Sequence, residues 1–501
     1  MGRRRTATCR AHPSQPASPL GRIAPIDHRR VTRTSPPPPA GNPPGWKVIL
    51  ALLSLSLSGL LWLSGLLSSL DRPSVGHTLN QRQLEVAALA APSLPPSLRT
   101  ALVGSDPRAT LARELQRQLD GDGEPLPLAG RLELRLLQTA AASRAPRALD
   151  TTDLQEMVEL PRRPLLQALA SGAAVTAAEQ RALLAPWAPS PMLRQLVCEW
   201  LSPGGAQPAA ARCPDERHPQ LLLLQLLAVD LLPIPLLLLG SALLLRELWR
   251  GWRHKLPAAA PWRGPALGGV DVTLLIAGGF VVLGEVLTPQ LLAPLLAVVL
   301  RQANLPGTVA QGVQVLLLYL GLMAAPLVIL TAQLRGLGPA PTAGWLQWTW
   351  RPLGPGLLQA VRTLLMVLPL VSLASWLIER LWKDPGGSNP LLELVLTSAD
   401  PLALGLFALT ALVLAPLFEE TLFRGVLLPV AAQRLGSVGG IVLSAAIFAL
   451  AHLSLGELVP LFLLGLGLGW LRWRSGRLST TVLMHALWNG LTFLNLLILA
   501  A

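Results

Sequence analysis

Long apolar runs alternate along the chain with short polar or basic loops. The first run, Val48 to Leu70, contains only apolar, serine and glycine residues, and about 20 such residues suffice to cross the core of a bilayer. The stretch 290–300 is apolar enough for a short interfacial helix or for part of a span. The pattern predicts an all-α, polytopic transmembrane helical bundle of about nine spans. Beyond the first run, the expected spans are 221–245, 270–287, 309–332, 355–378, 401–428, 438–455, 457–471 and 478–500.

Residues 71–218 differ in character, because they contain charges of both signs. Leucines recur with helical spacing in 110–119 and 132–137, and turn markers such as Pro95-Pro96 separate the segments. These features predict a mostly helical soluble domain inserted after the first span. It contains no catalytic constellation, and its role is open.

The remaining boundaries follow from composition. Residues 1–47 are basic and proline-rich, which predicts a disordered cytoplasmic tail, either a genuine tail or a targeting segment. The run 48–70 is expected to be a signal-anchor helix. Residues 219–354 would be accessory transmembrane helices, and residues 355–501 would form the functional core.

The charges of the loops favour one orientation in the membrane. Basic groups follow the second, sixth and eighth expected spans and include Arg246, Arg434 and Arg472. The loop 379–400 on the opposite side is mixed in charge. The positive-inside rule therefore predicts a cytoplasmic N-terminus and places residues 71–218 on the trans side. We expect an integral multi-pass protein of a bacterial inner membrane or a thylakoid membrane.

The composition agrees with a lipid environment. The chain is 51% hydrophobic and 14% charged, with a mean hydropathy of +0.48, whereas soluble domains carry about 25% charged residues. The net charge of +13 is not gathered into a basic face with interleaved aromatics, which argues against a nucleic-acid partner. Cys198 and Cys213 either form a disulfide or remain two thiols, and no Cys-x-x-Cys motif occurs.

Three polar clusters interrupt the apolar C-terminal third. A charged group at the centre of a membrane helix costs roughly 2.5–3.5 kcal/mol even on the mildest scales. A chain that keeps several such groups within so short a stretch is expected to use them. The clusters consist of Glu419, Glu420 and Arg424, then Phe448 and His452, then His485 and Asn489.

The spacing within these clusters predicts their local geometry. Glu420 and Arg424 are four residues apart, as are His485 and Asn489, so each pair lies on one face of a helix. Glu419 points about 100° away from Glu420. One of these two glutamates can therefore pair with Arg424, while the other stays free to act as a base.

These residue types fit the hydrolysis of an amide bond. A glutamate and a histidine that share one water form a general-base pair, and a second histidine with an asparagine can supply an oxyanion hole. No Gly-x-Ser-x-Gly elbow occurs, so water is the expected nucleophile. Glu419, His452 and His485 could instead hold Zn²⁺, although no His-Glu-x-x-His motif is present. We therefore favour a site without a cofactor and keep zinc as the alternative.

Glu-Glu-x-x-x-Arg, Phe-x-x-x-His and His-x-x-x-Asn follow one another on late apolar helices. This combination resembles the CPBP intramembrane protease family, also called the Abi or type II CAAX prenyl endopeptidase family and often labelled as metalloproteases. The resemblance covers roughly residues 355–495.

The resemblance implies a role for each motif residue. Glu419 would be the catalytic base and would work with His452 on a water molecule. His485 and Asn489 would stabilise the oxyanion. The supporting residues would be Glu420, Arg424 and Phe448.

The leading hypothesis is thus an intramembrane endopeptidase. Its substrate would be a membrane-embedded or lipidated protein or peptide within the lipid bilayer. The alternatives are a non-proteolytic membrane scaffold or chaperone, and a transporter whose buried charges line an ion path. No second copy of the charged cluster occurs in the first half of the chain, which argues against the transporter.

Three glycines alternate with leucines in the eighth expected span. They are Gly465, Gly467 and Gly469. We expect close contact between helices at this point rather than a phosphate-binding loop.

Overall fold

The computed structural model describes residue 2 and residues 43–71, 75–120, 126–142, 160–172, 174–187, 189–202, 213, 219–256, 259–260, 262–382 and 390–500. The prediction of a disordered tail therefore falls almost wholly outside the described residues. The first helix, α1, begins at Gly45, just before the expected start of the anchor.

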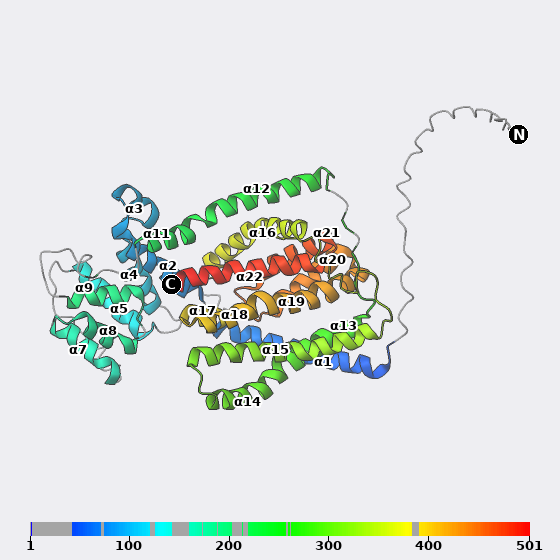
Figure 1. Ribbon diagram of the computed structural model, residues 1–501, viewed down its shortest axis with the longest axis horizontal. Helices are drawn as coiled ribbons and strands as arrows, with labels where there is room; N and C mark the ends of the chain where they lie inside the picture. Colours follow the sequence, from blue (N-terminus) through cyan, green and yellow to red (C-terminus); the bar gives the residue numbers. More distant parts are fainter. Residues whose placement is uncertain are drawn as a thin grey trace. The chain divides into compact units, whose positions relative to one another are not determined.

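The described ranges contain helices and no strand, which confirms the all-α class (Figure 1). Four segments that continue these helices are π-helical: Leu227–Leu231, Leu274–Leu287, Leu409–Leu414 and Thr421–Leu427. The α-helices are α1 (Gly45–Ser68), α2 (Val75–Ala90), α3 (Pro96–Val103), α4 (Pro107–Asp120), α5 (Leu128–Ala142), α7 (Arg163–Ser171), α8 (Ala177–Leu184), α9 (Pro191–Leu201), α11 (Pro219–Leu226), α12 (Pro233–Trp252), α13 (Gly269–Thr273), α14 (Thr288–Gln302), α15 (Gly307–Arg335), α16 (Leu353–Leu381), α17 (Pro390–Thr397), α18 (Pro401–Ala408), α19 (Ala415–Glu420), α20 (Leu428–Leu450), α21 (Leu458–Ser475) and α22 (Leu478–Ala500).

Seven helical segments of the described chain are long and apolar enough to cross a membrane. One of them, Pro401–Leu450, contains the expected span 401–428 and most of the span 438–455, and the chain bends within it at Gly436, whose φ of 73° is left-handed. The apolar stretch 290–300 falls in α14, which continues the segment Gly269–Gln302. The polytopic bundle is confirmed, whereas the number of spans stays a prediction.

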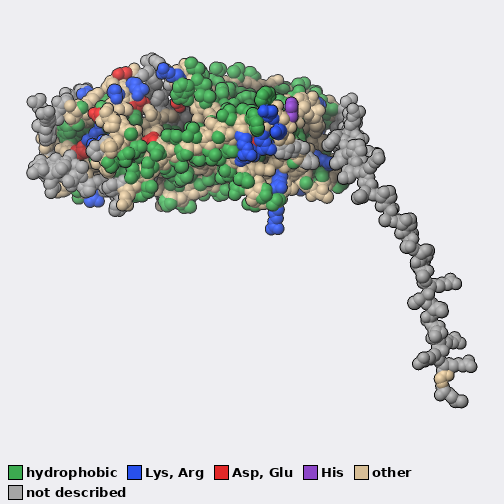
Figure 2. Space-filling view, turned by 90° about the horizontal axis from the view of Figure 1, so that it is seen from above, with side chains coloured by type: hydrophobic (Ala, Val, Ile, Leu, Met, Phe, Trp, Pro, Cys, Tyr) green, Lys and Arg blue, Asp and Glu red, His purple; other side chains and the backbone are tan. Residues whose placement is uncertain are grey.

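Leucine-rich faces point outward from the bundle, as expected for helices in lipid. On α1, Leu53 and Leu60 are exposed, while Ser58 is buried and its hydroxyl donates to the carbonyl of Ala277 at 2.9 Å. Figure 2 shows hydrophobic side chains over much of the middle of one face of the molecule. Ser58 therefore faces protein, while Leu53 and Leu60 lie on the outward face of α1.

The alternating glycines of α21 allow close helix packing, as predicted. A Cβ added to Gly465 would lie 2.9 Å from the Cβ of Ala445 in α20. One added to Gly467 would lie 2.3 Å from a methyl carbon of Val367 in α16. The Cβ position of Gly467 also lies 3.5 Å from Met484 of α22, so α21 packs against both helices that carry the second and third polar clusters.

Arg472 is not a loop residue, contrary to the expectation from loop charges. Helix α21 continues to Ser475 and ends at Gly476, which adopts a left-handed conformation, so Arg472 is fully buried within it. Its guanidinium donates to the carbonyls of Arg424 and Arg263 and to Gln347 Oε1. A buried cation needs such acceptors, and Arg472 thereby ties two connecting segments to the bundle.

Helices α2, α4, α5, α7, α8 and α9 pack around a separate hydrophobic core that includes Leu111, Leu132 and Leu193. A disulfide joins Cys198 at the end of α9 to Cys213, which settles the alternative left open by the sequence. Thr176 and Glu179 form a capping box at the start of α8.

Glu133 in α5 should make the stability of this helical domain depend on pH. Burial and the nearby Glu85 raise the pKa of Glu133 from 4.5 to about 8, and Ser190 donates to its carboxylate at 2.8 Å. Between these values the folded chain binds a proton that the unfolded chain does not. Stability should therefore fall by up to about 1.4 kcal/mol per pH unit as the pH rises towards 8. Glu133→Gln should flatten this slope, measured as the melting temperature of the full chain in detergent, and equal slopes for both proteins would contradict the assignment.

Candidate active site

The four residues expected to be catalytic line one cavity of about 1060 Å³. Glu419 lies near the end of α19, directly before the π-helical segment Thr421–Leu427. His452 follows the end of α20, and α22 carries both His485 and Asn489. Short π-helical stretches are frequent at functional sites, and here one carries the arginine of the first cluster.

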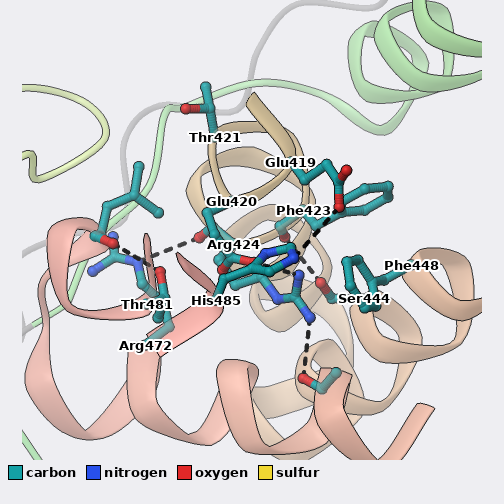
Figure 3. A network of polar contacts seen from close by, with 12 residues as sticks. Glu419, Glu420, Thr421, Phe423, Arg424, Ser444, Phe448, Arg472, Thr481 and His485 are labelled. Atoms are coloured by element: carbon teal, nitrogen blue, oxygen red, sulfur yellow. Dashed lines mark hydrogen bonds and ion pairs between the residues drawn. The ribbon is translucent and has the colours of Figure 1, made fainter. Parts of the chain in front are cut away.

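Glu420 lies at the centre of a buried network (Figure 3). Its Oε1 accepts a hydrogen bond from Arg424 Nη1 at 2.8 Å and lies 2.9 Å from His485 Nδ1. Neither Glu420 nor Arg424 is exposed at all. The sequence left open which of the two glutamates pairs with Arg424, and in the structure it is Glu420. This ion pair fixes the third cluster against the first, because Glu420 also contacts the ring of His485.

Glu419 points away from that pair, into the cavity. Its Oε1 accepts a hydrogen bond from Tyr319 Oη at 3.2 Å. Its Oε2 lies 3.9 Å from His485 Nε2, and this buried oxygen has no hydrogen-bond partner. One oxygen of the carboxylate is thus held by a neighbouring helix, and the other is available to a molecule in the cavity.

Phe448 organises the aromatic side of the site. Its ring makes edge contacts with His452 and His485, with centroid distances of 4.8 and 5.7 Å. The guanidinium of Arg424 lies over the ring of Phe448, 4.3 Å from the ring centroid. Because Phe448 is completely buried, these contacts leave each histidine ring little freedom to rotate.

The hydrogen bonds of the two histidines define their proton positions. His452 Nδ1 lies 2.8 Å from the carbonyl oxygen of Phe448, which can only accept, so Nδ1 carries the proton and Nε2 can act as an acceptor. By the same argument, His485 donates from Nδ1 to Glu420. Asn489 donates one amide proton to the carbonyl of Ala411 at 2.8 Å, and its second amide proton remains available.

A metal fits this arrangement poorly. Among the described residues, no three His, Cys, Asp or Glu side chains converge as the ligands of an ion. His485 Nδ1 faces Glu420, and its Nε2 lies 3.9 Å from Glu419 Oε2. We therefore derive no step through zinc.

Tyr319 was missed by the sequence reasoning. It lies in α15, one hundred positions before its partner Glu419, and outside the three polar clusters. It is the single tyrosine of the chain, and a phenol in an apolar span needs a polar partner. A lone tyrosine within an apolar span was therefore the signal by which the sequence could have indicated this site residue.

The end of α1 also supports the site, which the sequence reasoning did not predict. The backbone N–H of Leu455, in the loop after His452, donates to Ser69 Oγ at 3.3 Å. A Cβ added to Gly65 would lie 2.9 Å from Leu453 of the same loop. The first helix of the described chain thus supports the loop that follows His452, which no local pattern indicates.

The fold and the cavity define a class: an all-α, multi-pass membrane protein with a carboxylate and histidine site between its helices. Residues 401–491 match the family model described as type II CAAX prenyl endopeptidase Rce1-like. The chain therefore carries a domain of that family, and the resemblance to the CPBP intramembrane proteases is confirmed. The match runs from α18 into α22 and includes all seven motif residues, but not Tyr319.

A second family model, described as a domain of unknown function (DUF8675), matches residues 76–224. It covers the helical domain inserted after α1. No curated protein and no solved structure shows a match to the chain.

Proposed function

We propose that the protein is an intramembrane endopeptidase that cleaves a peptide bond of a membrane-associated polypeptide. The observation that carries this proposal is Glu419 Oε2, a buried carboxylate oxygen without a partner beside a cavity that also receives two histidines and an asparagine. A buried carboxylate oxygen without a hydrogen bond is costly, and a water molecule bound for reaction would satisfy Oε2.

In this mechanism, Glu419 removes a proton from a water molecule whose oxygen attacks the carbonyl carbon of the scissile bond. His452 Nε2 accepts from the same water and fixes its orientation. The proton held by Glu419 then passes to the amide nitrogen as the carbon–nitrogen bond breaks. The products are a free carboxylate and a free amine, so the reaction consumes only water.

The developing oxyanion needs hydrogen-bond donors. The second amide proton of Asn489 is one, because the first is held by Ala411. His485 can donate from Nε2 only when both of its ring nitrogens carry protons, since Nδ1–H already faces Glu420. One such donor is worth roughly 3–4 kcal/mol of transition-state stabilisation.

The test uses the purified full chain in liposomes with a library of internally quenched peptides. We expect hydrolysis that leaves new amine and carboxylate ends, identified by mass spectrometry, and that persists in a strong chelator. Hydrolysis lost with the chelator would overturn the metal-free mechanism. No hydrolysis by any preparation, together with retained binding of membrane proteins, would favour the scaffold.

Tyr319→Phe should lower kcat about tenfold while KM stays nearly constant. The hydroxyl donates to Glu419, and a hydrogen bond to a charged group contributes about 1.5–3 kcal/mol. The phenylalanine ring keeps the edge contact with Phe418, whose centroid is 6.3 Å away. Loss of this one hydrogen bond should lower the melting temperature only slightly, so the variant stays folded at the assay temperature. An unchanged kcat would exclude Tyr319 as a positioning residue, and loss of the folded protein would indicate a structural role instead.

A further inference from the structure

The cavity extends from Glu419 to the inserted helical domain. Among its described lining residues are Asn80 and Gln83 from α2 and Glu114 and Arg117 from α4. We call these four residues the outer wall. The same cavity is thus bounded by the protease-family domain and by the domain of unknown function.

The outer wall is attached to the membrane helices. Leu79 of α2 packs against the hydrophobic cluster that contains Phe407 of α18 and Leu496 of α22. Gln83 donates a hydrogen bond to Asp230, which lies in the π-helical segment before α12. Helix α2 is therefore held beside α22, the helix that supplies His485.

The opposite end of the bundle is basic. The backbone N–H of Ala260 donates to the carbonyl of Arg474, and Arg477 donates to the carbonyl of Pro352. Arg434 lies beside Gly269 at the start of α13. By the positive-inside rule this end faces the cytoplasm. None of the described residues in the loops 259–268 and 336–352 lines the cavity.

The disulfide gives independent evidence for the same orientation. Cys198 and Cys213 are joined in the domain that carries the outer wall. Structural disulfides persist in oxidising compartments and are rare in the cytosol. Loop charge and cysteine pairing thus both place the outer wall outside the cytoplasm.

The lining combines apolar and polar surfaces. The membrane helices contribute apolar side chains such as Leu464 and Trp488 next to the polar residues of the site. In the outer wall, Asn80 is exposed, and the side chain of Arg117 is 73% exposed although it pairs with Glu114. A polypeptide with an apolar part and a polar flank matches this combination of surfaces.

Resting on the proposed peptidase activity, we propose that the site takes its substrate from the extracytoplasmic side. The substrate is a polypeptide that leaves the membrane there. Its apolar segment reaches Glu419, and its polar flank lies against the outer wall. The domain of unknown function is thereby assigned the binding of that flank.

The side of access can be measured without catalysis. Thr492 lines the cavity, so Thr492→Cys in a Cys9→Ser background offers one thiol to a membrane-impermeant maleimide. We expect labelling in intact spheroplasts and little in sealed inverted vesicles until detergent is added. Labelling only in inverted vesicles would overturn the proposed side of access, whether or not the protein cleaves peptides.

The outer wall is tested by a double variant, with a single arginine variant on the same helix as its control. Arg117→Gln with Asn80→Leu should raise KM roughly tenfold for a quenched peptide with an apolar core and a polar flank. A short peptide without the flank should be cleaved as by the wild type. Arg113 is exposed on the same helix and does not line the cavity, so Arg113→Gln should change neither value.

The outcomes separate this proposal from the peptidase itself. An equal KM for the flanked peptide in wild type and double variant would overturn the role of the outer wall while leaving peptide cleavage intact. If the double variant cleaves both peptides less well by the same factor, the change is an effect on folding, and this result would also overturn the role of the outer wall.

Discussion

Glu419→Gln should abolish peptide hydrolysis while leaving the protein folded in the membrane. The amide keeps the shape and the contact with Tyr319 Oη, but it cannot take a proton from water. General-base catalysis contributes roughly a hundredfold to ten-thousandfold, so kcat should fall by at least the lower of these factors. The measurement is cleavage of the best quenched peptide in liposomes, with peptide affinity determined in parallel.

Glu393→Gln is the matched control. Glu393 lies in α17 next to residues that line the cavity but does not line it itself. Its replacement should leave kcat and KM unchanged. Full activity of Glu419→Gln would remove Glu419 from the mechanism and would favour a scaffold, which should tolerate this conservative change.

Arg424→Met should destabilise the protein by about 3–5 kcal/mol. Removing one partner of a buried ion pair leaves the other charge uncompensated, and both Glu420 and Arg424 have no exposed surface. The change also removes the guanidinium that covers the ring of Phe448. Thermal unfolding in detergent is the direct measurement.

The double variant Glu420→Leu with Arg424→Met distinguishes charge burial from loss of packing. If the uncompensated carboxylate is the main cost, the double variant should regain about half of the lost stability. Arg434→Met, on an exposed stretch of α20, should change stability by no more than about 0.5 kcal/mol. A double variant less stable than Arg424→Met would show that packing dominates.

The sequence predicted those features of the site that depend on residues close together in the chain. The separation of Glu420 and Arg424 follows from helix geometry alone, and polar residues in apolar spans are few enough to stand out. The same reasoning found the close packing at Gly465. In each case the partners lie on one helix, or a small residue marks the contact.

The unpredicted part depends on which helices become neighbours. Tyr319 meets Glu419 only because α15 packs beside the helix that carries it, and Ser69 meets Leu455 across most of the chain. Arg472 was misplaced because its charge suggested a loop, whereas carbonyl groups from distant segments satisfy it inside α21. A single sequence does not specify such tertiary partners.

The site draws its residues from helices that are made at very different times during translation. Ser69 emerges early, Tyr319 much later, and His485 and Asn489 belong to α22, which follows all the other helices of the site. A ribosome-bound chain therefore has Glu419 in the membrane before either of the proposed oxyanion donors exists. The proposed enzyme is accordingly inert while it is being inserted, and neither its own unfinished helices nor neighbouring nascent proteins can be cut until α22 has docked.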